Sequence, residues 1–182
     1  MLESDIGQAL VRIRPGARVK GRIPLGTSAS GSELGIPWIA LRGATDGPCL
    51  WINGQVHGDE INGLLAGFDF INGLDPARLR GLVVMTTTAN PFALEARRKK
   101  TPADEEDLDQ AYPGRPDGLQ TERLAAALFA AVAEHATVTV CMHAVGTPYE
   151  AVPYGVYKVH PDSGFDEAAM IRMTAHFRPA IT

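Results

Sequence analysis

Short apolar runs recur along the chain, separated by turns rich in glycine, serine and proline. This pattern predicts strands at residues 17–24, 36–42, 49–53, 81–88 and 136–142, with turns at 25–35 and 43–48. The run at 17–24 partly alternates between apolar and polar residues, which favours an edge strand. The continuous apolar runs at 49–53 and 136–142 are typical of strands buried on both faces. A further strand is predicted at 152–159.

Two longer segments have apolar residues at helical spacing. These residues are Ile61, Leu64, Leu65, Phe68 and Ile71 in segment 60–74, and Leu124, Ala127, Leu128, Ala131 and Val132 in segment 119–135. A short helix is also predicted at 165–176. Residues 89–118 carry several prolines and runs of charge, and we predict one long irregular loop there. A loop of this length in a compact domain is usually either functional or disordered.

The predicted order β-β-β-α-β-loop-α-β places the chain in the α/β class. We expect a mixed, largely parallel sheet flanked by helices. Ligand sites in such sheets form in the loops at the carboxyl ends of strands. The two candidate positions are therefore the loop after 49–53 and the loop after 136–142.

Composition excludes several classes of protein. The chain has 182 residues, 45% of them hydrophobic and 21% charged, which are ordinary globular values and disfavour a disordered segment or a coiled coil. A net charge of −4 disfavours nucleic-acid binding. No apolar run approaches the length of a membrane span, and two cysteines outside any CxxC pair suit a reducing compartment. We therefore expect a cytoplasmic protein without nucleic-acid or membrane partners.

The segment after 49–53 contains His57 and Glu60, three residues apart at a predicted strand-to-helix junction. Catalytic zinc sites commonly use two histidines and one carboxylate and leave a fourth position open. His143 directly follows 136–142 and is the candidate third ligand, because side chains at neighbouring strand ends can converge. Gly58 would ease the tight backbone, and Asp59 would orient a ligand or cap the following helix.

Structural roles for these histidines compete with the metal hypothesis. An HxxE pair is common, and a histidine after a strand is often a cap or a core residue. His135 lies at a predicted helix C-terminus, where it suits the helix dipole. His160 and His176 have no evident partner. A metal-free α/β domain with structural histidines therefore stays open as an alternative.

The string GPCLWINGQVHGDEINGLLAG resembles the signature of the succinylglutamate desuccinylase/aspartoacylase family, a branch of the zinc carboxypeptidase-like superfamily. Further matches follow in order at Asn90-Pro91, Thr101-Pro102, the 107–114 segment DLDQAYPG, the 121–125 segment TERLA, and Met142-His143. The resemblance covers about residues 15–160. It implies a zinc-carboxypeptidase-like core with one Zn²⁺ per chain, bound by His57, Glu60 and His143.

Departures from the family pattern concern its substrate-carboxylate site. The family usually has Asn-Arg where this chain has Asp109-Gln110. A glutamine cannot form the bidentate, charge-assisted clamp of an arginine. Two like charges about 4 Å apart near a surface repel by about 4 kcal/mol, so Asp109 would repel a substrate carboxylate. A second basic position of the family falls on Lys99, with Arg98 beside it, and Cys141 stands where the family usually has an aspartate.

The family also carries a catalytic glutamate well past the third ligand, followed by a β-rich domain, and neither is evident before Thr182. Glu150 is the nearest candidate base, with Tyr149 or Tyr154 as candidate cleft residues. We therefore interpret residues 1–182 as a single catalytic domain that lacks its usual C-terminal part. A sheet left incomplete exposes an edge or an apolar face, so we expect a homo-oligomer.

These observations favour a zinc-dependent hydrolase of amide bonds, acting on an N-acyl amino acid or a short peptide with altered recognition of the substrate carboxylate. The alternative is a catalytically impaired metal-binding or interaction module of the same fold. Zinc-stimulated turnover would distinguish the two.

Overall fold

The computed structural model describes residues 6–146, 149–159, 162, 164 and 166–180. Internal contacts divide the chain into two compact units, residues 1–147 and 148–182. The described sheet belongs to the first unit. The second unit contains α6 (Glu167–Ala175), which begins after Asp166, whose side chain accepts a hydrogen bond from the Ala169 N–H. This helix was predicted at 165–176.

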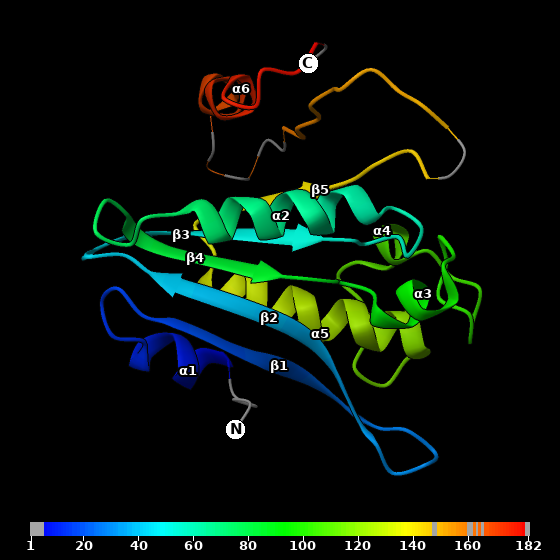
Figure 1. The fold of residues 1–182 in the computed structure, drawn as a ribbon. Coiled ribbons are helices and arrows are strands. Elements are labelled where there is room, and N and C mark those ends of the chain that lie inside the picture. The colour runs from blue at the N-terminus through cyan, green and yellow to red at the C-terminus, as the bar shows by residue number, and fades with distance from the viewer. Residues whose placement is uncertain (1–5, 147–148, 160–161, 163, 165, 181–182) are drawn as a thin grey trace. The chain divides into compact units, whose positions relative to one another are not determined.

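A five-stranded sheet in the order β1-β2-β4-β3-β5 forms the centre of the first unit (Figure 1). Its strands are β1 (Arg18–Thr27), β2 (Glu33–Arg42), β3 (Thr45–Gly54), β4 (Arg80–Thr86) and β5 (Val138–Met142). Strand β3 pairs in parallel with β4 and with β5, whereas β2 pairs antiparallel with β1 and β4. The sheet is therefore mixed, with its parallel strands together on one side.

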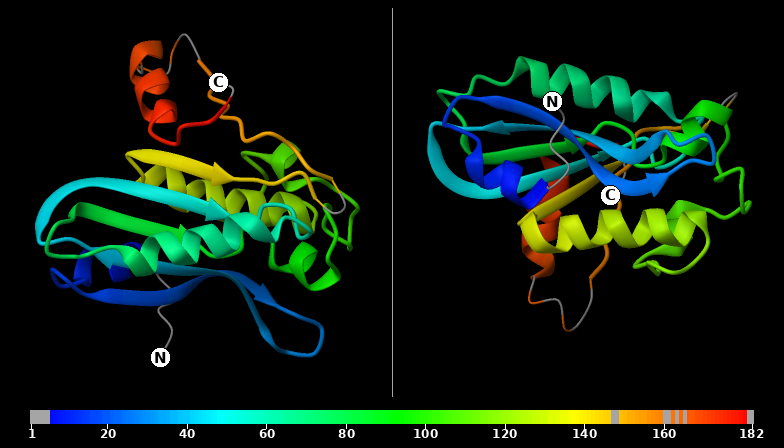
Figure 2. Two further views of the ribbon diagram at one scale, coloured as in Figure 1. Left: turned by 45° about the horizontal axis from the view of Figure 1, so that its top comes forward. Right: turned by 90° about the horizontal axis from the view of Figure 1, so that it is seen from below.

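Helices cover both faces of this sheet. The described helices of this unit are α1 (Ile6–Arg12), α2 (Ile61–Gly73), α3 (Pro91–Ala96), α4 (Leu108–Ala111) and α5 (Gln120–His135). Helix α2 lies on one face, and α1 and α5 lie on the other (Figures 1 and 2). The predicted class, a mixed α/β sheet flanked by helices, is confirmed.

Alternation along β3 builds two apolar cores. Trp51 points to the face covered by α5 and packs in a cluster with Leu124 and Leu128, all three with no solvent exposure. Ile52 points to the opposite face and packs in a second cluster with Ile71. Complete burial of such side chains stabilises the fold by about 1.5–3 kcal/mol each.

Helix α2 packs on the sheet through two glycines as well as through part of the predicted apolar stripe, which includes the buried Ile71. Gly63 and Gly67 are buried, whereas Ile61 and Leu65 are about half exposed. A Cβ on Gly63 would lie 2.5 Å from the carbonyl oxygen of Met142 in β5. At Gly63 and Gly67 the helix lies too close to the sheet for a side chain, so the stripe prediction is only partly right.

Two other predictions need correction. Strand β5 is not buried on both faces: it is the edge of the described sheet, and its residues are half-buried or exposed in alternation. Its one strand neighbour in the described sheet is β3, and its last residue, Met142, lies against Gly63 of α2. Segment 152–159 contains no strand.

The long segment 89–118 is not wholly irregular, because it contains α3 and α4. Both helices start from side-chain caps: the Asn90 side chain accepts from the Ala93 N–H at 3.0 Å, and that of Asp107 accepts from the Asp109 N–H at 3.0 Å. Such caps satisfy backbone donors that short helices leave unpaired.

Among the described residues, no helix combines the length and apolar character that crossing a bilayer requires.

Candidate metal centre

The loop between β3 and α2 carries His57 and Glu60. Both are buried, with 5% and 7% of their surface exposed. Glu60 occupies the N-cap position of α2 but makes no side-chain cap hydrogen bond, so its carboxylate is directed to other partners. The Gln55 amide donates to the Gly58 carbonyl at 3.1 Å and braces this turn.

Gly58 is required by close packing. A Cβ at this position would lie 1.9 Å from the carbonyl oxygen of Ala93 in α3. Its backbone N–H donates to the Arg98 carbonyl at 2.9 Å. The turn that carries His57 is therefore held against the segment that follows α3, whereas the sequence suggested only an easing of local backbone geometry.

His143 reaches the same place because β3 and β5 are neighbours. Gly54 at the end of β3 pairs with Met142 at the end of β5, so the residues that follow both strands emerge at one edge of the sheet. Neighbouring strands are about 4.8 Å apart. The sequence predicts that two neighbouring strand ends bring His57 and His143 together. The pairing of β3 with β5 agrees with this prediction.

The Glu60 carboxylate lies between the two imidazoles. Its Oε1 is 2.9 Å from His57 Nδ1, and its Oε2 is 2.9 Å from His143 Nδ1. The Ala144 N–H also donates to Oε2 at 3.0 Å. The ring centroids are 5.0 Å apart. The structure thus brings together the three side chains that the sequence predicts as metal ligands, and their role as ligands stays a prediction.

Two aspartates contact the opposite, Nε2 edges of the same rings. Asp107 Oδ1 lies 3.1 Å from His57 Nε2. Asp109 Oδ2 lies 3.6 Å from His57 Nε2 and 3.5 Å from His143 Nε2. His57, Asp109 and His143 therefore also offer ligand atoms, which lie within 4.8 Å of one another. The sequence assigned Asp109 to the substrate and gave Asp107 no role, although both lie in the DLDQ motif.

The predicted substrate-binding cations are engaged by acidic neighbours. Arg98 donates twice to Glu105, at 2.8 and 2.7 Å. Lys99 Nζ lies 3.1 Å from Asp107 Oδ2 and so belongs to the network around His57. Gln110 is exposed, and its backbone N–H donates to the Asp107 carbonyl at 3.0 Å.

The other residues that the sequence predicts for the site are Asp59, Cys141 and three residues of the second unit. Asp59 faces Gly146, where a Cβ would lie 2.9 Å from Asp59 Oδ2, and its buried Oδ1 lacks a hydrogen-bond partner among the described residues. Glu150, Tyr149 and Tyr154 are exposed residues of the second unit, and their roles stay predictions. Cys141 Sγ accepts a hydrogen bond from Asn53 Nδ2 at 3.6 Å.

The remaining histidines give no support to a site. His135 ends α5, where the sequence placed it. His176 Nδ1 contacts the Arg172 carbonyl at 2.6 Å in the second unit. His160 lies outside the described residues.

Hydrogen bonds and ion pairs stabilise the charged forms of Glu60, Asp107 and Lys99. Burial alone would raise the pKa of Glu60, but the Ala144 N–H and the two imidazoles outweigh it and hold the pKa below its ordinary value. Burial would likewise raise the pKa of Asp107, but Lys99, the Asp109 N–H and His57 lower it. Contact with Asp107 in turn raises the pKa of Lys99.

We expect acid to destabilise the metal-free protein through these two carboxylates. Their pKa values are lower in the folded chain than the ordinary 4.5 of Glu60 and 3.8 of Asp107. The stability they contribute is therefore fully present above those ordinary values and is lost as pH falls through the lower, folded values. Denaturant titrations of chelator-treated protein from about pH 6 to about pH 3 should show this loss. The Glu60→Gln variant should show a shallower loss, and an equal pH dependence would contradict the prediction.

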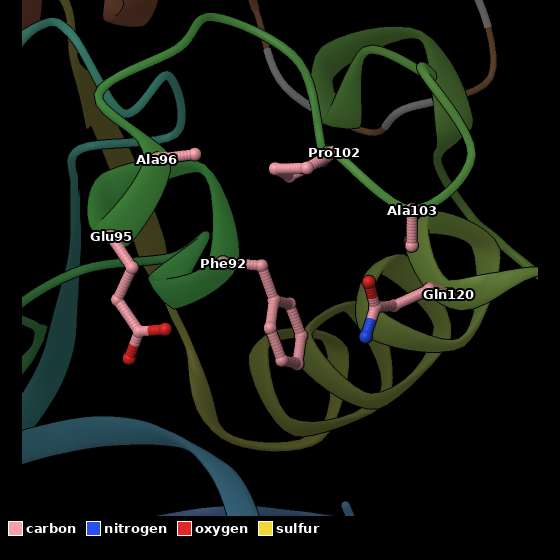
Figure 3. Close-up of a pocket in the computed structure, with 6 residues that line it drawn as sticks. All are labelled: Phe92, Glu95, Ala96, Pro102, Ala103 and Gln120. Atoms are coloured by element: carbon pink, nitrogen blue, oxygen red, sulfur yellow. The ribbon is translucent and has the colours of Figure 1, made fainter.

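A separate surface cavity of about 500 Å³ lies between α3 and the start of α5 (Figure 3). Its lining residues are Phe92, Glu95, Ala96, Pro102, Ala103 and Gln120. In Figure 3 the Phe92 ring and the Gln120 amide both point into this space. None of the predicted ligands lines it.

Comparison with known proteins agrees with this fold. Residues 46–180 match the sequence profile of the succinylglutamate desuccinylase/aspartoacylase catalytic domain. The chain is 28% identical over 118 residues to an N-alpha-acetyl-L-2,4-diaminobutyric acid deacetylase of Halomonas elongata, covering 65% of this chain and 34% of that protein.

Solved structures of similar fold lead in the same direction. An aspartoacylase family protein of Mesorhizobium loti has a TM-score of 0.78 and 25% identity, with 91% of this chain and 52% of that chain covered. A succinylglutamate desuccinylase/aspartoacylase of Rhodobacter sphaeroides has a TM-score of 0.67 and 31% identity, with 75% and 43% covered. The chain thus spans about half, or less, of the length of these relatives. It belongs to the succinylglutamate desuccinylase/aspartoacylase family.

Proposed function

We propose that this chain contains the metal centre of a zinc-dependent hydrolase that cleaves the amide bond of an N-acyl amino acid or a short peptide. The observation that carries the proposal is the Glu60 carboxylate, which lies 2.9 Å from Nδ1 of both His57 and His143. Two imidazoles and one carboxylate are the donor set of catalytic zinc sites. One Zn²⁺ per chain is proposed, with these three residues as its ligands.

The arrangement of the rings supports this choice of ligands. With a cation at the Nδ1 edges, each ring still has a carboxylate at its Nε2 edge: Asp107 for His57, at 3.1 Å, and Asp109 for His143, at 3.5 Å. Metal-binding histidines almost always have such an outer partner on the second nitrogen. Zinc and other first-row cations suit this donor set, so the donor chemistry fits the metal that the resemblance implies.

A bound zinc ion would polarise the scissile carbonyl and acidify a water molecule. The chain's own residues would set the geometry: Asp107 orients His57, and Lys99 neutralises part of the charge of Asp107. A carboxylate base must take the proton of the water and pass it to the leaving amine.

Charges around the centre favour substrates without a carboxylate near Asp109. Arg98 is paired with Glu105 and Lys99 with Asp107, and Gln110 carries no charge. The Halomonas relative is named for a substrate that carries an extra amino group. We therefore propose that neutral or basic N-acyl amino acids are preferred over acidic ones.

Hydrolysis of a panel of N-acetyl amino acids with acidic, neutral and basic side chains tests the proposal. Turnover should disappear after chelator treatment and return with added Zn²⁺, because the reaction depends on the bound ion. Zinc binding without turnover would instead support the alternative, a metal-binding module without catalysis. Absence of zinc binding would contradict both and leave a metal-free α/β domain.

A further inference from the structure

The two imidazoles are contacted at both edges by carboxylates. Glu60 contacts both Nδ1 atoms, and Asp109 is the other described carboxylate whose contacts include both rings. Asp107, in contrast, contacts only His57 among these rings. The pair is thus held between one buried carboxylate and one that is about one-third exposed.

A single oxygen makes both contacts of Asp109. Its Oδ2 is 3.6 Å from His57 Nε2 and 3.5 Å from His143 Nε2. These distances exceed the range of ordinary N–H···O hydrogen bonds, so the interaction is electrostatic and is shared nearly equally between the rings. A carboxylate in this position favours the tautomer with hydrogen on Nε2, which leaves the Nδ1 lone pairs for a cation.

Asp107 fixes the position of Asp109. Its Oδ1 accepts from the Asp109 N–H at 3.0 Å and lies 3.1 Å from His57 Nε2. The backbone of Asp109 is therefore tied to the same oxygen that contacts one of the imidazoles. Lys99 holds the other oxygen of Asp107 at 3.1 Å.

We propose that Asp109 is a positioning residue of the metal centre, which orients His57 and His143 together through their Nε2 edges. This inference rests on the proposed metal centre and assigns Asp109 a role that a substrate-binding residue would not have. An asparagine at this position would keep the shape of the side chain but lose the charge that acts on both rings. Carboxylates that orient metal-binding histidines typically change metal affinity 10–100-fold when replaced.

Zinc affinity measured by competition with a chelator tests this role. In the full chain, Asp109→Asn should lower the affinity about 10-fold, the lower end of the range for such partners, because the contacts are long. Asp69→Asn is the matched control: it makes the same change of charge at an exposed position of α2 and should leave the affinity unchanged. Equal affinities for the two variants would overturn the proposal.

Imidazole ¹⁵N NMR of the zinc-loaded chain gives a second readout that loss of folding would not mimic. Zinc on Nδ1 and hydrogen on Nε2 of both rings are expected. Zinc on the Nε2 atoms would overturn the proposal, because Asp109 would then be a ligand and Glu60 the outer partner. Failure of the proposed metal centre can be distinguished from failure of the Asp109 role alone. If the centre is wrong, His57→Ala will bind as much zinc as the wild type, and the Asp109 role will be contradicted as well.

Discussion

Replacement of His57 by alanine should abolish the proposed zinc binding and any hydrolysis that depends on zinc. The imidazole is one of only two nitrogen donors in the proposed ligand set, and it is 5% exposed between Glu60 and Asp107. Loss of a direct ligand should lower metal affinity by more than the 10–100-fold typical of outer partners. Metal content after purification and chelator competition measure the effect.

His135→Ala is the control for this substitution. His135 ends α5, and it is not among the residues that contact the imidazole pair. Its replacement should leave zinc content unchanged. Equal zinc in His57→Ala and the wild type would contradict the ligand assignment and, with it, the proposed function.

Gly58→Ala should destabilise the fold by at least about 2 kcal/mol, a value within the range for overpacking. The added Cβ would lie 1.9 Å from the Ala93 carbonyl oxygen, and that neighbour is backbone, which cannot rotate away. Either α3 or the turn that carries His57 must move. A shift of about 4–8 °C in melting temperature follows for a chain of this size, together with weaker zinc binding.

Gly73→Ala provides the matched control. Gly73 is the last residue of α2, and a Cβ there would meet no atom within 4 Å. Alanine has the higher helix propensity, so stability should be unchanged or slightly increased. If Gly58→Ala melts no lower than Gly73→Ala, close packing is not the reason for glycine at residue 58.

The predictable part of the centre followed from strand ends. His57 lies four positions beyond the apolar run 49–53 and His143 directly follows the run 136–142. Parallel pairing of these runs brings the residues beyond them to one edge of the sheet. Nothing comparable marks Asp107 and Asp109. They reach the rings because the Gly58 N–H bonds the Arg98 carbonyl and Asp107 caps α4. The bond between Gly58 and Arg98 is a tertiary contact with no sequence period, whereas the Asp107 cap is local.

The packing face of α2 escaped prediction for a related reason. Helical periodicity gives weight to large apolar side chains, so Ile61 and Leu65 entered the predicted stripe. Ile71 of that stripe is buried, but the other buried positions are Gly63 and Gly67, whose lack of a side chain allows close approach to β5 and β4. Hydrophobic periodicity cannot predict a contact that the helix makes through its glycine backbone.

The pairing of β3 with β5 joins distant parts of the chain at the imidazole pair. Glu60 and His143 are 83 positions apart in the sequence. A cation bound by both would close that long loop in the manner of a reversible crosslink, and loop closure removes more entropy from the unfolded chain as the loop lengthens. The free energy of metal binding then adds to the stability of the fold. The edge strand β5 should be stabilised most, because it has only one strand neighbour in the described sheet. Chelation should therefore increase hydrogen exchange first in β5.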